Sequence, residues 1–120
     1  MKQNNIIRDK SLEFAIEIVT LYKKLKEVRE YTFADQILRS GASIAANVEE
    51  ATAAISKRDF IAKMSISSKE ARETRLWLAI LEKGAIIDHD LTPYFKLVDE
   101  LINILTAIVK TAQANLNEVK

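Results

Sequence analysis

Apolar residues recur along the chain at alternating spacings of four and three residues, which marks one face of an α-helix. The first segment spans about residues 10–29, and its stripe is Phe14, Ile18, Leu21, Leu25 and Val28. A second apolar stripe lies beside it and consists of Leu12, Ile16, Val19 and Tyr22. The apolar sector of this helix is therefore broad, which indicates either deep burial or a second contact surface.

A second helix is predicted over about residues 33–54, with Thr32 as its N-cap and an acidic residue, Asp35, three positions later. Its stripe is Ile37, Gly41, Ile44, Val48, Ala51 and Ile55. The stripe is small near its centre, and Gly41 costs about 1 kcal/mol of helix propensity relative to alanine. Close approach of a neighbouring helix is the usual reason for such a cost, and we expect that neighbour to be the third helix.

The third helix is predicted over about residues 57–83, because Ser56 and Asp59 repeat the capping pattern and Gly84 supplies a stop. Its stripe is Phe60, Met64, Ser67, Ala71, Thr74, Leu78 and Leu81. Only a few residues separate it from the second helix, so the two should be antiparallel neighbours.

A fourth helix is predicted over about residues 93–112, where Thr92 and Pro93 fit an N-cap followed by a proline. Its stripe is Leu97, Leu101, Ile104 and Ile108, flanked by Val98, Leu105 and Val109. We expect the polar tail from about Gln113 to fray. The pattern as a whole predicts an all-α fold, an antiparallel up-down-up-down four-helix bundle, in one domain over residues 1–120.

Composition narrows the classes of function. The chain has 120 residues with two glycines, one proline and no cysteine, which favours long helices and excludes disulfides and thiolate metal sites. No apolar run approaches the ~20 residues of a membrane span, and no secretory signal is visible, so we expect a cytoplasmic protein without a membrane partner. The net charge of +1 gives no global case for nucleic acid, although residues 1–30 and 56–84 carry a basic surplus.

The strongest enzymatic hypothesis is a carboxylate metal site, because Glu70 and Glu73 lie one turn apart and Glu50 lies on the partner helix. Four-helix di-metal sites also need Glu-x-x-His, and the single histidine, His89, belongs to the connection before the fourth helix. No nucleophile setting or glycine-rich phosphate loop is present. We therefore predict no catalytic residue, no metal and no cofactor, and keep a metal-dependent enzyme as a remote alternative.

A polar stripe borders the apolar stripe of the second helix and consists of Gln36, Ser40, Ser43, Asn47 and Glu50. Polar groups at a packed boundary need hydrogen-bond partners. The candidates are Arg39, Glu70, Glu73 and Arg75, which would form an interhelical network. A ligand or partner site is the alternative interpretation of the same stripe.

Two groups of cations are candidate nucleic-acid contacts: Lys23, Lys24, Lys26 and Arg29 at the end of the first helix, and Lys57, Arg58, Lys69 and Arg72 on the third. The first group also suits the helix macrodipole, and either group could be a solvated face. Neither is interleaved with aromatic residues, so stacking on bases is not indicated. Trp77, next to Leu78, either covers the edge of the core or fills a subunit interface.

The strongest match to known proteins runs over residues 35–78. Its characteristic residues are Asp35-Gln36, Arg39-Ser40, Ser43-Ile44, Asn47-Val48, Glu50, Phe60, Ile66, Lys69-Glu70-Ala71-Arg72-Glu73 and Trp77-Leu78. With them the chain resembles, from about Phe14 to Ile108, the family of 23S rRNA intervening-sequence proteins, which were noticed inside insertions in bacterial ribosomal RNA genes. Many members have Asn-Ile-Ala-Glu-Gly where this chain has Asn47-Val48-Glu49-Glu50-Ala51.

The resemblance implies an antiparallel four-helix bundle that assembles as a homopentamer. A related branch is the accessory protein of diversity-generating retroelements, which binds nucleic acid and a reverse transcriptase. No catalytic residue is implied, and Asn47, Glu50 and Glu73 correspond only to characteristic polar positions. We therefore expect a non-enzymatic oligomer that binds RNA or a nucleic-acid-processing protein. The alternative is a scaffolding protein that binds only protein partners.

Overall fold

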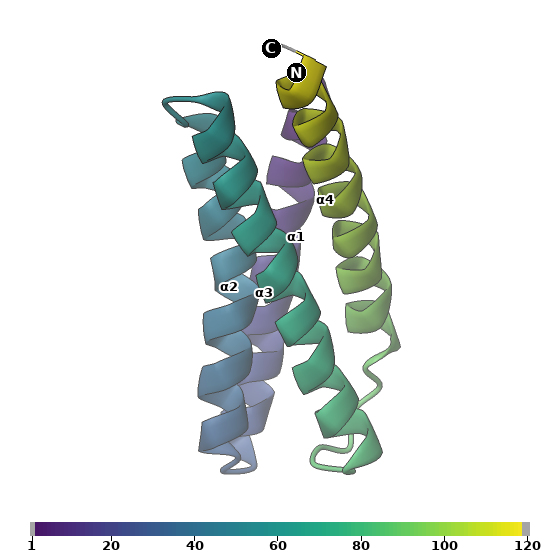
Figure 1. The fold of residues 1–120 in the computed structure, drawn as a ribbon. Helices are drawn as coiled ribbons and strands as arrows, with labels where there is room; N and C mark the ends of the chain where they lie inside the picture. The colour runs from purple at the N-terminus through teal and green to yellow at the C-terminus, as the bar shows by residue number, and fades with distance from the viewer. Residues whose placement is uncertain (1, 119–120) are drawn as a thin grey trace.

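The computed structural model describes the backbone of residues 2–118, which form four helices, and the side chains of residues 5–117. The helices are α1 (Lys2–Glu27), α2 (Tyr31–Thr52), α3 (Lys57–Lys83) and α4 (Thr92–Glu118). They pack side by side into a bundle of 54 × 22 × 22 Å (Figure 1). The prediction of an all-α, antiparallel up-down-up-down four-helix bundle is confirmed.

The helices follow one another around the bundle axis. Each packs against the next in the chain, and α4 closes the ring against α1 through the least extensive of the four seams. The α1–α2 and α3–α4 connections lie at one end, and the α2–α3 connection lies at the other end with both termini (Figure 1). Within residues 2–118, no helix combines the length and the apolar character that crossing a membrane requires.

The buried stripes of α2 and α3 follow the predicted spacing, except that Ile55, predicted as the last stripe residue of the second helix, lies beyond α2 and is 94% exposed. On α3 the buried residues are Met64, Ser67, Ala71, Thr74, Leu78 and Leu81, and Phe60 is half-buried against the same core. On α1 the stripe continues toward the N-terminus through Ile7 and Ser11, both buried. These two residues explain why α1 begins at Lys2 and not near residue 10 as predicted.

The turn between α1 and α2 corrects two sequence predictions. Arg29 has a φ of 64°, and the Glu30 N–H donates to the Leu25 carbonyl at 2.9 Å, which is the hydrogen-bond pattern of a Schellman motif. The chain reverses so tightly that α2 already begins at Tyr31, and its N-cap is Glu30, without a side-chain cap. Thr32 is therefore a helical residue and not the cap. Val28 lies beyond α1 and is 53% exposed, so it does not belong to the core.

The ends of α3 agree with the sequence prediction more closely. Ser56 Oγ accepts from the Asp59 N–H at 3.0 Å, as the capping pattern predicts. Gly84 is the C-cap, but the positive φ of 51° falls one residue later, on Ala85. A Cβ on Gly84 would lie 2.8 Å from the Ile80 carbonyl oxygen, so steric room and not a left-handed backbone accounts for this glycine.

The fourth helix differs from its prediction at both ends and in its register. The Thr92 N–H donates to Asp90 Oδ1 at 3.0 Å, so the capping side chain is that of Asp90. The helix continues to Glu118 because half-buried Leu116 lines a groove with Ile61 of α3; the last two residues lie outside the described part. The core residues are Tyr94, Val98, Leu101, Leu105 and Ile108, whereas Leu97 and Ile104 are only half-buried.

The small residues at the centre of α2 contact two different helices, α1 and α3. A Cβ on Gly41 would lie 3.0 Å from both Cγ1 and Cγ2 of Ile18, so the glycine permits close approach to α1 and not, as predicted, to α3. Toward α3 the contacts are hydrogen bonds. Ser67 Oγ donates to the Ile44 carbonyl at 2.8 Å, and Thr74 Oγ1 lies 2.9 Å from Ser40 Oγ.

The α1–α2 approach generates the first prediction. Gly41→Ala should lower the free energy of unfolding by about 1 kcal/mol, because overpacking by ~1–3 kcal/mol outweighs the gain of ~1 kcal/mol in helix propensity. Urea unfolding monitored by circular dichroism measures the change. In an Ile18→Ala background the same substitution should be neutral or stabilising, since the two closest atoms are gone. An equal loss in both backgrounds would contradict this account.

Candidate functional site

The largest cluster of charged side chains joins α2 to α3. Arg39 of α2 forms ion pairs with Glu70, at 3.3 Å between Nη1 and Oε2, and with Glu73, both on α3. Gln36, one turn before Arg39, accepts from Arg39 Nε at 3.2 Å and from Nη2 at 3.1 Å. Gln36 and Arg39 are three residues apart on α2, and Glu70 and Glu73 are three residues apart on α3, so each pair shares one helix face. The Arg39 guanidinium therefore lies between two carboxylates and an amide oxygen.

Trp77 belongs to the same cluster. Its indole Nε1 donates to Glu73 Oε2 at 3.0 Å, so one carboxylate binds both the guanidinium and the indole. The ring also packs edge-on against Phe33 of α2, with 6.1 Å between centroids and 78° between planes. Trp77 is half-buried and covers the edge of the core between α2 and α3.

Of the predicted polar stripe, only Gln36 belongs to this cluster. Asn47 donates to the carbonyl of Ser43 at 2.9 Å and to its hydroxyl at 3.1 Å, both within α2. Glu50 pairs with Lys63 of α3 at 3.0 Å, and this hydrogen bond raises the pKa of the Lys63 ammonium. The stripe is therefore divided among the cluster, the Ser40–Thr74 hydrogen bond, local bonds within α2 and a separate ion pair.

Arg75, the remaining predicted partner, turns the other way. Its Nε lies 2.6 Å from Asp99 Oδ1 of α4, and this hydrogen bond raises the pKa of the guanidinium. Its guanidinium also lies 5.2 Å from the centroid of the Phe95 ring. Arg75 thus joins α3 to α4 and has no part in the α2–α3 cluster.

The side chains of the cluster are held by one another across the α2–α3 seam. Arg39 occupies the position between Glu70 and Glu73 that a metal ion would need, and Glu50 is paired elsewhere. Among residues 5–117, no three His, Cys, Asp or Glu side chains gather as metal ligands, and no buried polar side-chain atom lacks a hydrogen-bond partner. His89 is exposed in the connection before α4, with its ring 6.1 Å from that of Tyr94.

The structure does not bring the predicted basic groups together. Lys23, Lys24, Lys26 and Arg29 lie at the end of the bundle that holds the α1–α2 connection, whereas Lys57 and Arg58 open α3 at the opposite end. Lys26 lies over the Tyr22 ring, 5.2 Å from its centroid. Lys69 and Arg72 are exposed along the middle of α3.

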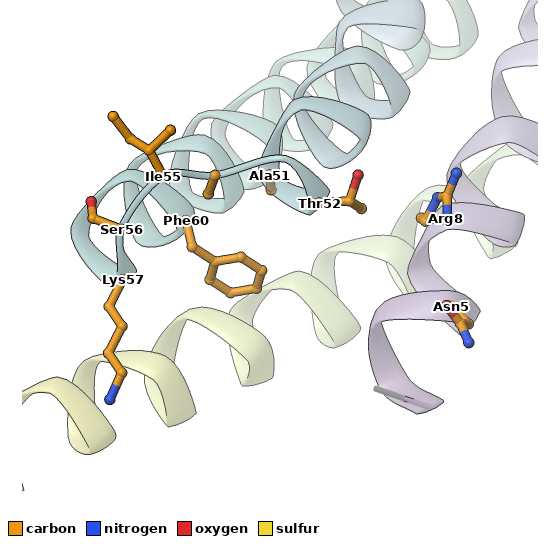
Figure 2. A pocket seen from close by; sticks show the side chains of 9 residues that line it. Asn5, Arg8, Ala51, Thr52, Ile55, Ser56, Lys57 and Phe60 are labelled. Atoms are coloured by element: carbon orange, nitrogen blue, oxygen red, sulfur yellow. The ribbon is translucent and has the colours of Figure 1, made fainter.

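An open groove lies at the end of the bundle where α2 passes into α3 (Figure 2). It has a volume of about 460 Å³ and extends from Arg8 of α1 to Phe60, whose ring projects into the space. Ile55 lines its rim and points away from it, with 94% of its surface exposed. The Arg8 guanidinium on the α1 side of the groove is held by Glu49 at 3.1 Å.

The second apolar stripe of α1, which the sequence indicated to be either deeply buried or a contact surface, lies on the exposed side of the helix. Leu12 and Ile16 are each 58% exposed, so the second apolar stripe is a surface and is not deeply buried. A groove of about 460 Å³ joins Leu12 to Ala45 and Ala46 of α2. We call the surface formed by Leu12, Ile16 and Val19 of α1 with Leu38, Ala42 and Ala46 of α2 the α1–α2 apolar face.

The class of protein that these features define is an antiparallel four-helix bundle whose helices are joined by ion pairs and small-residue seams. The chain belongs to the 23S rRNA-intervening sequence protein family, whose model matches residues 3–107, and the resemblance inferred from the sequence is confirmed. No curated protein matches the chain.

A solved structure is closely similar. It is the crystal structure of a protein of unknown function from the S23 ribosomal protein family of Bacteroides thetaiotaomicron VPI-5482. The two chains are 44% identical, with a TM-score of 0.86 over 90% of this chain and 98% of the other. The similarity therefore extends over nearly the whole bundle.

The α2–α3 cluster generates the second prediction. Arg39→Met should lower the free energy of unfolding by about 1 kcal/mol, because it leaves two adjacent carboxylates unpaired, one of them Glu70 with only 15% of its side chain exposed. Adding Glu70→Gln and Glu73→Gln should recover part of that loss. Arg8→Met, the same change at the more exposed pair with Glu49, should cost less than about 0.5 kcal/mol. Equal losses in urea unfolding for the two methionine variants would contradict this ranking.

Proposed function

We propose that the protein is a non-enzymatic, self-assembling bundle that acts by binding RNA. The observation that carries the proposal is the α1–α2 apolar face, which exposes three aliphatic side chains of α1 along one line. Contiguous exposed apolar surface of this kind is characteristic of protein–protein interfaces. The occupant of this face is a second copy of the chain, and the complete assembly is a homopentamer, in keeping with the resemblance to the family.

The register of α1 and α2 supports one continuous face. Arg8 pairs with Glu49 near one end of the two helices, and Ile18 lies against Gly41 near the middle. This antiparallel register sets Leu38 and Ala42 alongside Val19 and Ile16. The formal net charge of +1 leaves little electrostatic repulsion between copies.

Two observations support an RNA partner. The family's name refers to intervening sequences of 23S rRNA. The ion pairs of the described residues use Arg8, Lys10, Arg39, Lys63 and Arg75. The third-helix cations predicted as nucleic-acid contacts, Lys57, Arg58, Lys69 and Arg72, are not among them, so their charge remains available for phosphates. Scaffolding of protein partners alone is the second candidate.

The apolar face generates the third prediction. Ile16→Glu should convert the assembly into a monomer at micromolar concentration, because a carboxylate would be desolvated in the interface. Light scattering coupled to size-exclusion chromatography measures the mass. Ile55→Glu introduces the same side chain at an isolated, 94% exposed position and should leave the mass unchanged. A monomeric wild-type protein would refute the assembly.

RNA binding generates the fourth prediction. Fluorescence anisotropy with a labelled 20-nucleotide single-stranded RNA should show binding that weakens at least tenfold between about 50 and 200 mM salt, since released counterions drive such contacts. Absence of binding at low salt, together with recovery of a defined protein partner, would overturn the RNA role in favour of scaffolding.

A further inference from the structure

A groove lined by hydrogen-bond donors runs between α3 and α4. Its polar residues are Ser65, Ser68 and Arg72 of α3 with Thr106, Lys110 and Gln113 of α4. Val109 lines the groove between them, and its volume is about 270 Å³. We call this surface the α3–α4 groove. It combines two cations, three hydroxyls and one amide, and no carboxylate lines it.

The positive charge of the α3–α4 groove is not neutralised by its neighbours. Arg72 Nη2 donates to Thr106 Oγ1 at 3.2 Å, which holds the guanidinium across the groove from α3 to α4. Neither Arg72 nor Lys110 forms an ion pair with any carboxylate in the part of the chain that the structure describes. Asp99, lower on α4, is held by Arg75 at 2.6 Å.

The groove continues toward the end of the bundle. Gln113 also lines a second hollow of about 380 Å³ that contains Arg58, Ile61 and Leu116. At a rise of 1.5 Å per residue, Arg58 lies about 21 Å along α3 from Arg72, with exposed Lys69 nearby. Four cations therefore follow one seam of the bundle over the length of several nucleotides.

We propose that the α3–α4 groove is where the phosphates of a single RNA strand bind, a proposal that rests on the proposed RNA-binding function and gives it a location. Cations and hydroxyls are the side chains that contact phosphate oxygens, and the groove supplies both from two facing helices. Aromatic side chains for base stacking are absent from its lining. Since contacts to phosphates carry no sequence information, binding in the groove should be independent of base sequence.

The other basic group fits this role less well. Lys23 and Lys26 lie at the far end of the bundle, and the Lys26 ammonium already lies over the Tyr22 ring. Glu27 and Glu30 lie within four residues of Lys26 in the chain, so the local charge is mixed. Screening over about 8 Å at physiological salt separates this group from the groove electrostatically.

The test compares two double variants that remove the same charge. In anisotropy measurements with a labelled 20-nucleotide oligo(U) RNA, Arg72→Gln with Lys110→Gln should weaken binding about tenfold at 50 mM salt. The slope of log K against log salt should become shallower by about 1.4, or about 0.7 per lost phosphate contact. The control, Lys23→Gln with Lys26→Gln, should bind as the wild type does.

A third variant tests whether the hydroxyls of the α3–α4 groove contribute to RNA binding in addition to its positive charge. Ser65→Ala with Ser68→Ala keeps every cation, so it should weaken binding severalfold while the salt slope stays unchanged. It also guards against a folding defect in the charge variant, because the hydroxyl changes are small and lie on the same surface. Circular dichroism and urea unfolding of all variants verify that the bundle is intact.

The possible outcomes separate a failure of the α3–α4 groove as the binding location from a failure of RNA binding as the function. Equal weakening by both charge variants, or weakening by the control alone, would overturn the groove while RNA binding stands. Wild-type affinity in the serine variant would likewise show that the groove is not the contact surface. Failure of the wild-type protein to bind the RNA at all would overturn both the groove and the proposed function.

Discussion

The structure depends most on how α2 packs between its two neighbours. At Gly41 it lies so close to α1 that a Cβ would meet Ile18 at 3.0 Å, while one residue earlier the Ser40 hydroxyl meets Thr74 of α3. The two seams fix both the depth and the rotation of α2. With that rotation fixed, the next residue back, Arg39, projects at the surface between α2 and α3, where Glu70 and Glu73 lie. The ion cluster is thus a consequence of the packing and adds to it at the rim.

The fold was predictable because the periodicity of α2 and α3 is strict. The beginning of α1 was not, since Ile6 and Ile7 are a single apolar pair among polar residues and only packing against the other helices buries Ile7. The register of α4 was ambiguous because adjacent apolar residues such as Leu97 and Val98 offer two stripes, and only packing selects Val98. The direction in which Gly41 faces was equally hidden, because a residue at the centre of a stripe touches both neighbours.

The candidate sites were less predictable than the fold. Sequence spacing identified Arg39, Glu70 and Glu73 as possible partners, but it also offered Arg75, which the rotation of α3 turns toward Asp99. For the α3–α4 groove, the sequence identified Arg72 as a candidate contact but did not indicate that Lys110 lies beside it. Arg72 and Lys110 are separated by most of a helix and a connection, and they meet only because α3 and α4 are antiparallel. The net charge of each sequence segment therefore does not show that cations from two different helices lie side by side.

The proposed surfaces lie on opposite sides of the ring of helices. The α1–α2 apolar face occupies one outer side of the bundle, and the α3–α4 groove occupies the opposite side. In the proposed assembly, contacts made by the first surface therefore do not cover the second surface of the same copy. Several weak grooves on one assembly act at high effective concentration once the first has bound a strand, and avidity then exceeds the affinity of a single groove. The proposed arrangement would reconcile the proposed RNA binding with a formal net charge of only +1, because several copies of one groove would act in place of a strongly basic subunit.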